Sequence, residues 1–360
     1  MSLTRIMLDP NDPNTPPPRT LAAQRPVIGG GIRVSATQFP LSHIGIAWQG
    51  SQAHVRIQTA AGWSDWKTVT GCSAGRDGRE ATSGAVVVAP GAVSYELAID
   101  GSGVGEVTEL NTAEGPAVAA AAAVTTPTIG MPLPDGTWCP VNYVTRAGWG
   151  ADESLRFNNK NEELWPPEYY PVQSLTVHHS AGVNNDPNPA ATVRAIYFFQ
   201  CVTEAWGDIG YHLLIDEAGR VYEGRVSGGS IPVFQGVVNA GQPPQMNTGA
   251  HILGYNTGNI GVCLLGDMTS VWPTPVTQAA LATVLAGLAR TNGLNPFGTV
   301  NYFNPVNNNT ANVNTISGHR NWAATQCPGN TFYPTLPRIR TMTYGQTRGI
   351  PPRRRVGSAG

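Results

Sequence analysis

SLTVHHS, residues 174–180, is a short apolar run that ends in two adjacent histidines and a serine. A run of this length and composition predicts a β-strand. Successive side chains of a strand point to opposite faces, so only one of His178 and His179 can point into a given site. The spacing does not choose between them. A single histidine is more often a core residue, but a pair at a strand end beside a Ser/Gly turn is a candidate for chemistry.

Three further stretches predict strands on the same grounds, and two stretches predict helices. The strands are expected at residues 211–216 (YHLLID), 220–224 (RVYEG) and 260–266 (IGVCLLG). Helical spacing follows NNDPNPA at Val193, Ile196, Tyr197 and Gln200, and recurs at Leu281, Val284, Leu285 and Leu288. Thr277 is a candidate N-cap for the second helix and Gly293 a candidate stop. This alternation predicts an α/β domain with a mixed central β-sheet flanked by helices.

The sequence before this domain has a different pattern. Apolar residues alternate in short segments between glycine-containing turns, which predicts a small β-sandwich-like accessory domain over residues 28–112. The alternating residues are Ile44, Ile46 and Trp48, then Val55 and Ile57, then Val93, Tyr95, Leu97 and Ile99. The remaining boundaries follow from composition: an extended Pro-rich arm at 1–27, an Ala/Pro linker at 113–138, the α/β domain at 139–342 and a basic tail at 343–360.

Charge and hydropathy exclude several classes of function. The net charge is -1 and 12% of the residues are charged, so no basic face indicates nucleic acid or anionic lipid as a partner. No apolar run reaches the roughly 18 residues that a membrane span needs. The first twenty residues have no apolar core of the kind that marks a secretory signal.

The stretch GHRNWAATQCPG, residues 318–329, places a histidine and a cysteine in one loop. Imidazole and thiolate are the usual ligands of zinc, and a catalytic zinc takes three protein ligands and leaves a fourth position for water. His319 and Cys327 therefore need a third ligand, and the histidine pair at 178–179 is the best source.

Five motifs in this order resemble the zinc-dependent type 2 N-acetylmuramoyl-L-alanine amidases and the peptidoglycan recognition proteins. They are TRAGWGADES, TVHHSAG, WGDIGYHLLIDEAGRVYEGR, GAHILGYNTGNIGVCLLGD and ISGHRNWAATQCPG. The resemblance covers roughly residues 139–342. The region before it resembles the N-terminal β domain of some secreted bacterial amidases. The resemblance implies that His178, His319 and Cys327 hold Zn²⁺.

It also implies roles for residues around the metal. Tyr211 and Thr325 correspond to catalytic positions that stabilise the oxyanion or the attacking water. His251 and Asn256 correspond to groove positions that touch substrate. From the residues alone, Tyr211 could equally be a core aromatic, and Thr325 a hydroxyl that stabilises its loop.

The function implied is hydrolysis of the amide bond between N-acetylmuramic acid and L-alanine in peptidoglycan, by metal-activated water. The alternatives are a non-catalytic peptidoglycan-binding module and a wall-degrading component of a phage particle or lysis system, joined to a larger assembly through the N-terminal arm. Retention of Cys327 and Tyr211 favours the enzyme. The expected place of action is the bacterial cell wall, reached by secretion or phage delivery.

Departures from the family pattern are informative. One branch of type 2 amidases has a glutamate general base where this chain has Cys263, which we expect to be a buried free thiol. No disulfide is predicted between Cys139 and Cys201. Glu223 and Arg225 of the YEGR motif are expected to support a turn or an ion pair beside the site.

Overall fold

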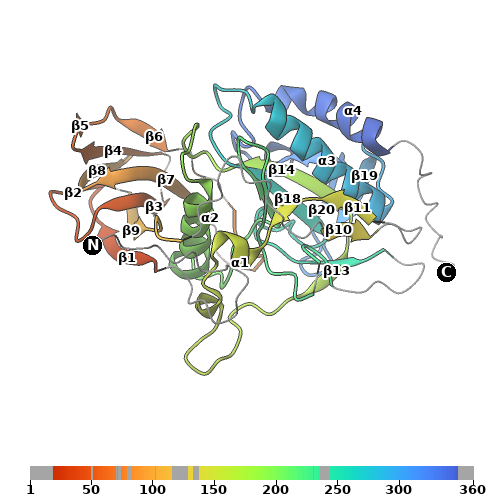
Figure 1. Ribbon diagram of the computed structural model, residues 1–360, viewed down its shortest axis with the longest axis horizontal. Helices are drawn as coiled ribbons and strands as arrows, with labels where there is room; N and C mark the ends of the chain where they lie inside the picture. The colour runs from red at the N-terminus through yellow and green to blue at the C-terminus, as the bar shows by residue number, and fades with distance from the viewer. Residues whose placement is uncertain are drawn as a thin grey trace, which may run out of the picture.

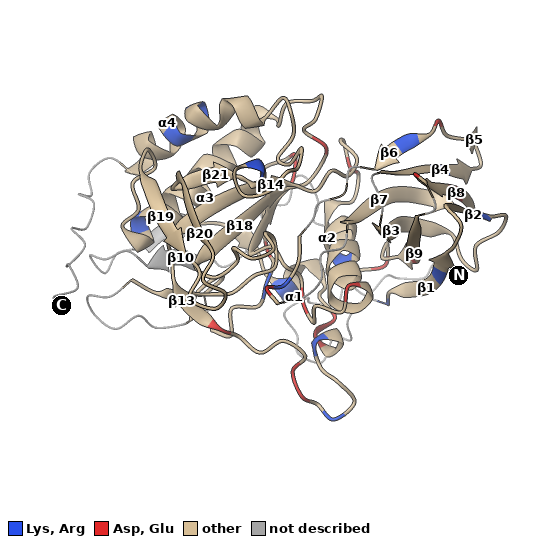
Figure 2. Ribbon diagram, turned by 180° about the vertical axis from the view of Figure 1, so that it is seen from behind, with Lys and Arg blue, Asp and Glu red and all other residues tan. Residues whose placement is uncertain are grey.

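The computed structural model describes residues 19–49, 52–69, 71, 74–78, 83–101, 103–115, 129–132, 138–229, 231–235 and 243–347. An N-terminal β-sandwich packs against a C-terminal α/β domain, with helix α2 (Pro189–Phe198) between the two (Figure 1). This confirms the predicted fold class. In the view of Figure 2, positively and negatively charged residues are both spread over the two domains. Within the described residues, no helix has both the length and the apolar character needed to cross a membrane.

The sandwich consists of two antiparallel sheets that share one core. One sheet has the order β1-β9-β3-β7, and the other has the order β2-β8-β4-β5 with β6 also paired to β4. Their bounds are β1 Leu21–Val27, β2 Gly31–Val34, β3 Leu41–Gln49, β4 Ala53–Thr59, β5 Gly62–Trp63, β6 Lys67–Val69, β7 Ser83–Ala92, β8 Ser94–Ile99 and β9 Val104–Asn111. The predicted alternation is confirmed at Tyr95, Leu97 and Ile99, which are buried. Val93 is an exception: it lies at the turn between β7 and β8 and is 47% exposed.

The predicted domain boundaries are wrong in three places. Residues 21–27 were expected in the arm, but they form β1, which pairs with β9 from Leu21↔Asn111 to Val27↔Gly105. The expected linker contains most of a hairpin, β10 (Ile129–Pro132) and β11 (Trp138–Val141), which contacts α3 (Pro275–Asn292). The expected tail begins inside helix α4 (Leu336–Thr347). Residues 1–18, 116–128 and 348–360 lie outside the described part of the chain.

The α/β domain is built on a six-stranded sheet of order β12-β16-β15-β18-β14-β21. Its strands are β12 Tyr143–Val144, β14 Ser174–His179, β15 Leu213–Ile215, β16 Val221–Glu223, β18 Asn259–Leu264 and β21 Ile316–Gly318. All pairs are parallel except β15–β16. Smaller elements complete the domain: α1 Arg146–Trp149, β13 Tyr169–Pro171, β17 Gln245–Asn247, β19 Thr299–Phe303 and β20 Thr310–Asn314.

Helices cover both faces of this sheet, so alternate residues of each strand enter different cores. In β18, Ile260, Val262 and Leu264 pack with α3 and α4. Cys263 is fully buried on the opposite face, in the core that includes α2, as expected, and within the described residues it is in no disulfide. The strands are therefore apolar on both sides, as buried parallel strands are.

Helix ends follow local side-chain chemistry, with one correction. The N-cap of α3 is Thr274, whose hydroxyl accepts a hydrogen bond from the Thr277 amide. Thr277, the expected cap, lies one turn further in, where its hydroxyl donates to the Asp216 carbonyl. Pro275 takes the first helical position, where its missing N–H costs nothing. Gly293 ends the helix in the left-handed region, with φ 63°.

Two glycines of the sandwich shape a slot for one aromatic side chain of the α/β domain. Phe199, at the end of α2, packs against Gly45 of β3 and Gly84 of β7. A Cβ atom on Gly84 would lie 3.0 Å from the Phe199 ring, and one on Gly45 would lie closer still. The absence of side chains at these positions allows the sheet to approach α2.

The Gly45→Ala variant should lower the free energy of unfolding by about 1–3 kcal/mol, because the added methyl group has to displace the Phe199 ring. The measurement is the midpoint of denaturant-induced unfolding. In a Phe199→Ala background the same change should cost much less, since the ring is gone. If Gly45→Ala lowered the free energy of unfolding equally in the two backgrounds, the contact with the Phe199 ring would not be the cause of the loss.

A buried polar cluster also joins the two domains. His43 of β3 lies within hydrogen-bond distance of Ser42 Oγ (2.8 Å) and of Thr192 Oγ1 in α2 (2.8 Å). Arg194 of α2 donates to the Thr112 carbonyl through Nε and Nη2. Burial, with the neighbouring Arg194 charge, lowers the pKa of His43 to about 3. The interface is therefore built around a neutral histidine.

This histidine makes folding stability depend on pH. An unfolded histidine has a pKa near about 6.5, so between that value and pH 3 the unfolded chain binds a proton that the folded chain excludes. Stability therefore falls as the pH falls, by about 2 kcal/mol for this group between pH 7 and pH 5. Between pH 7 and pH 5, the midpoint of denaturant-induced unfolding should therefore decrease less in His43→Gln than in the wild type. A decrease of the same size in both proteins would contradict this role of His43.

Candidate metal centre

Strand β14 places its two terminal histidines on opposite faces of the sheet. Leu175 and Val177 point into the core that contains α3, and His179 follows them to that side, where its Nδ1 accepts from the Met268 amide at 3.0 Å. His178 points to the other face, toward α2 and Tyr211. Only one of the pair faces the candidate site, as strand geometry requires.

His178, His319 and Cys327 form a buried cluster. Their ligand atoms all lie within 4.8 Å of one another, and Cys327 Sγ is 3.6 Å from His178 Nδ1. The exposures are 0%, 0% and 2%. His319 directly follows β21, which pairs in parallel with β14, so both histidines emerge at the same sheet edge. The Arg320 amide donates to the Cys327 carbonyl at 3.0 Å and closes the loop that brings the thiol back.

These three residues suit zinc. Two imidazoles and one thiolate are a typical zinc donor set, and ligand atoms around a tetrahedral ion at zinc bond lengths lie about 3.3–3.8 Å apart. The 3.6 Å separation of Cys327 Sγ and His178 Nδ1 falls in this range, and the other separations in the cluster are at most 4.8 Å. Within the described residues the group has three members, and three protein ligands with a fourth position for water is the number typical of catalytic zinc sites.

A chain of hydrogen bonds fixes which nitrogen of His178 is available. His251 Nε2 lies 2.9 Å from the Asn259 carbonyl, which can only accept, so this nitrogen donates. Burial and the neighbouring His178 lower the pKa of His251 well below the usual value, so its other nitrogen, Nδ1, is an acceptor. His178 Nε2 therefore donates to His251 Nδ1 over 3.0 Å. The lone pair of His178 is then on Nδ1, which faces Cys327.

Tyr211 and Thr325 lie beside this cluster in different ways. The ring centroid of Tyr211 is 5.4 Å from that of His178, and the side chain is 5% exposed. Thr325 Oγ1 accepts from the Cys327 amide at 3.2 Å, which stabilises the cysteine loop. The hydroxyl proton of Thr325 is not used in that bond.

His251 and Asn256 were expected to touch substrate, but both are 0% exposed. The His251 ring is enclosed between His178 and the Asn259 carbonyl. Asn256 is held by the loop from the N-terminal domain, through the Gly75 carbonyl (2.8 Å) and Asp77 Oδ1 (2.7 Å). Neither side chain reaches a surface here, because packing within the domain and the docked sandwich cover them.

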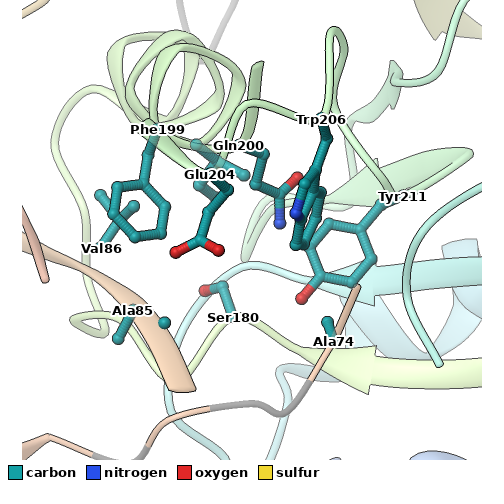
Figure 3. A pocket seen from close by; sticks show the side chains of 11 residues that line it. Ala74, Ala85, Val86, Ser180, Phe199, Gln200, Glu204, Trp206 and Tyr211 are labelled. Atoms are coloured by element: carbon teal, nitrogen blue, oxygen red, sulfur yellow. The ribbon is translucent and has the colours of Figure 1, made fainter. Parts of the chain in front are cut away.

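A small open pocket lies beside Tyr211 and between the two domains. In Figure 3, the Tyr211 hydroxyl and the Glu204 carboxylate point into it. Gln200, Trp206 and Ser180 continue the wall on the α/β side. The sandwich contributes the facing wall, from Ala74 and Gly84, Ala85 and Val86. Of these lining residues, only Tyr211 was a candidate site residue from the sequence, because the pocket joins segments far apart in the chain.

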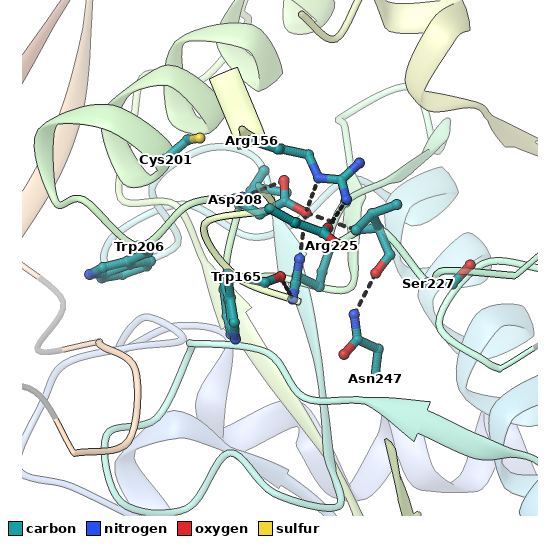
Figure 4. A network of polar contacts seen from close by, with 12 residues as sticks. Arg156, Trp165, Cys201, Trp206, Asp208, Arg225, Ser227 and Asn247 are labelled. Carbon is teal, nitrogen blue, oxygen red and sulfur yellow. Dashed lines mark hydrogen bonds and ion pairs between the residues drawn. The ribbon is translucent and has the colours of Figure 1, made fainter. Parts of the chain in front are cut away.

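A buried carboxylate anchors the segment that carries Tyr211. Asp208, 0% exposed, accepts from Arg225 Nη1 at 2.9 Å and pairs with Arg146 Nη1 at 3.0 Å, with Arg156 nearby (Figure 4). Burial raises the pKa of Asp208, but the three guanidinium charges outweigh it and hold the pKa below its usual value. The Arg225 amide donates to the Tyr211 carbonyl at 2.7 Å. Arg225 thus supports the site as an ion-pair residue, as the sequence indicated.

Residues 168–330 match the family Amidase_2, described as N-acetylmuramoyl-L-alanine amidase. This part of the chain is therefore similar to that family. The predicted resemblance to N-acetylmuramoyl-L-alanine amidases and peptidoglycan recognition proteins is confirmed. The sandwich lies outside the matched segment.

Relatives of this domain carry two kinds of name. The N-acetylmuramoyl-L-alanine amidase of Homo sapiens is 29% identical over 206 residues, 55% of this chain and 28% of the human protein. Peptidoglycan-recognition protein LB of Drosophila melanogaster is 25% identical over 223 residues, 61% of this chain and 77% of that protein. The solved structure of wild-type Drosophila PGRP-LB has a TM-score of 0.38 at 23% identity, and the match covers 54% of this chain and 91% of that chain. This chain therefore spans under a third of the human relative's length.

The hydrogen-bond chain behind His178 predicts the effect of removing His251. We expect His251→Ala to weaken zinc binding by about 10–100-fold, because His178 loses the acceptor that fixes its tautomer and ring orientation. Competition with a chromophoric chelator measures the affinity. His54→Ala, in the sandwich, is the matched control and should bind as the wild type does. An unchanged affinity in His251→Ala would contradict this account of the site.

Proposed function

We propose that this chain is a zinc-dependent peptidoglycan hydrolase that cleaves the amide bond between N-acetylmuramic acid and L-alanine. The observation that supports the proposal is the buried cluster of His178, His319 and Cys327 beside Tyr211. The family of residues 168–330 and its amidase-named relatives agree with it. The partner is peptidoglycan, and the place of action is the bacterial cell wall.

Each side chain of the site has a distinct task in this reaction. His178 and His319 each offer a neutral nitrogen, and Cys327 offers a thiolate, so the set carries one negative charge. When bound, zinc supplies a Lewis acid that polarises the amide carbonyl and makes water acidic enough to attack near neutral pH. The net reaction adds water across the C–N bond: hydroxyl goes to the carbonyl carbon, and the L-alanine nitrogen leaves with a proton.

Tyr211 and Thr325 are the candidate hydrogen-bond donors. The Tyr211 hydroxyl points into the cavity beside the cluster (Figure 3), where it can donate to an oxygen that gains negative charge. Thr325 keeps its hydroxyl proton while its oxygen accepts from the Cys327 amide. Both residues can thus stabilise charge without losing their structural contacts.

The test is mass spectrometry of soluble products after the full chain is incubated with peptidoglycan, with and without a chelator. We expect free peptides that begin with L-alanine, and their loss on chelation and in Cys327→Ser, which lacks the thiolate ligand. Cys201→Ala is the matched control: Cys201 is buried, its thiol contacts the Leu155 carbonyl, and burial raises its pKa to about 12. This variant should stay active.

Two results would overturn the proposal. A metal-free Cys327→Ser protein that cuts at the wild-type rate would exclude the zinc mechanism. Binding to peptidoglycan without release of peptide would instead indicate a recognition protein, the class that the name of the Drosophila relative LB indicates.

A further inference from the structure

A short segment of the N-terminal domain, Ala74–Asp77, lies against the α/β domain next to the metal centre. Ala74 packs in a small cluster with Trp165, Trp206 and Ala250, and it lines the cavity beside Tyr211 (Figure 3). Arg76 Nη1 donates to the Trp206 carbonyl at 2.9 Å. The sandwich therefore reaches the site through its own side chains and backbone.

Asp77 is the polar end of this segment. Its Oδ1 accepts from the Gly254 amide (2.7 Å) and from Asn256 Nδ2 (2.7 Å), and its Oδ2 accepts from Asn304 Nδ2 (2.9 Å). Burial raises the pKa of Asp77 despite these hydrogen bonds, so the carboxylate is substantially desolvated. Removing it would leave the Asn256 amide short of one acceptor in a buried place.

Asn256 connects Asp77 to the metal centre through hydrogen bonds. While Nδ2 donates to Gly75 and Asp77, Oδ1 accepts from the backbone amides of His251 (2.7 Å) and Ile252 (2.9 Å). The His251 ring then accepts from His178 Nε2 at 3.0 Å. All three side chains, Asn256, His251 and His178, are 0% exposed, so no water competes for these bonds.

We propose that Asp77 is a positioning residue for the metal centre: through Asn256 and His251 it holds His178 in the orientation that binds metal. The N-terminal sandwich is then part of the catalytic unit. It does not act as a separate binding module, because the slot for Phe199 and the His43 cluster hold it against α2 and so keep Asp77 next to Asn256. This inference rests on the metal site of the proposed function.

The test is the zinc affinity of the full chain, measured by chelator competition. Asp77→Ala should weaken binding by about 3–10-fold, less than His251→Ala because it acts one residue further away. Asp77→Asn keeps one acceptor oxygen for Asn256 and Gly254, so it should stay within about twofold of the wild type. Asp65→Ala, at an exposed turn of the sandwich, is the matched control of equal charge change and should have no effect.

A double-mutant cycle separates positioning from a general structural role. In a His251→Ala background, Asp77→Ala should have little further effect on zinc affinity, because the route to His178 is already broken. A full additional loss in that background, or an unchanged affinity in Asp77→Ala alone, would overturn the inference. Failure of the wild-type chain to bind zinc would instead overturn the proposed function.

A second pair of variants tests the inference if Asp77→Ala does not fold. Asn256→Asp places two carboxylates in contact and should weaken zinc binding. Adding Asp77→Asn to it replaces one of the two facing carboxylates by an amide that can donate to the other, and should recover part of the loss; the Gly75 carbonyl still faces the carboxylate at position 256. No recovery in the double variant would count against the route through Asn256.

Discussion

The parallel pairing of β14 with β21 is the constraint on which the site depends. Parallel strands bring their carboxyl ends to one edge of the sheet, which is where α/β proteins place functional residues. Here His178 lies at the end of β14 and His319 directly after β21. The flanking β18, also parallel, closes the other side of β14 and is buried on both faces. Of the three candidate ligands, His178 therefore lies on a strand, His319 begins the 3-10 turn directly after β21, and Cys327 comes from a loop.

The surroundings of the cluster explain how buried polar groups are tolerated there. Two fully buried histidines near His178 have hydrogen-bond partners: His212 bonds the Asn247 carbonyl and the Gly261 amide, and His251 bonds the Asn259 carbonyl and His178. Burial lowers the pKa of His212 to about 4, so this ring is neutral as well. A neutral, connected network fixes ring orientations without adding charge beside the candidate metal ligands.

The N-terminal domain changes how the α/β domain should be viewed. Its sheet covers α2, its glycines receive Phe199, and it forms one wall of the cavity beside Tyr211. Residues that looked like open groove positions, His251 and Asn256, are buried as a result of this docking and of packing within the domain. The structure of the site therefore depends on how the two domains pack together.

Local patterns in the sequence predicted the strands around 174–179 and 260–266 and the two main helices, because alternation and helical spacing are local properties. The candidate ligands were predicted from residue types and motifs. The sequence also supplied the five motifs of the family. It could not choose between His178 and His179, since a strand pattern is the same for either face, and it placed β1 in an arm because pairing with β9, some eighty residues away, leaves no local signal. Only the tertiary structure decided that Asp77, Asn256 and His251 form one route to His178, because hydrogen bonds between distant segments exist only once both domains are folded and packed together.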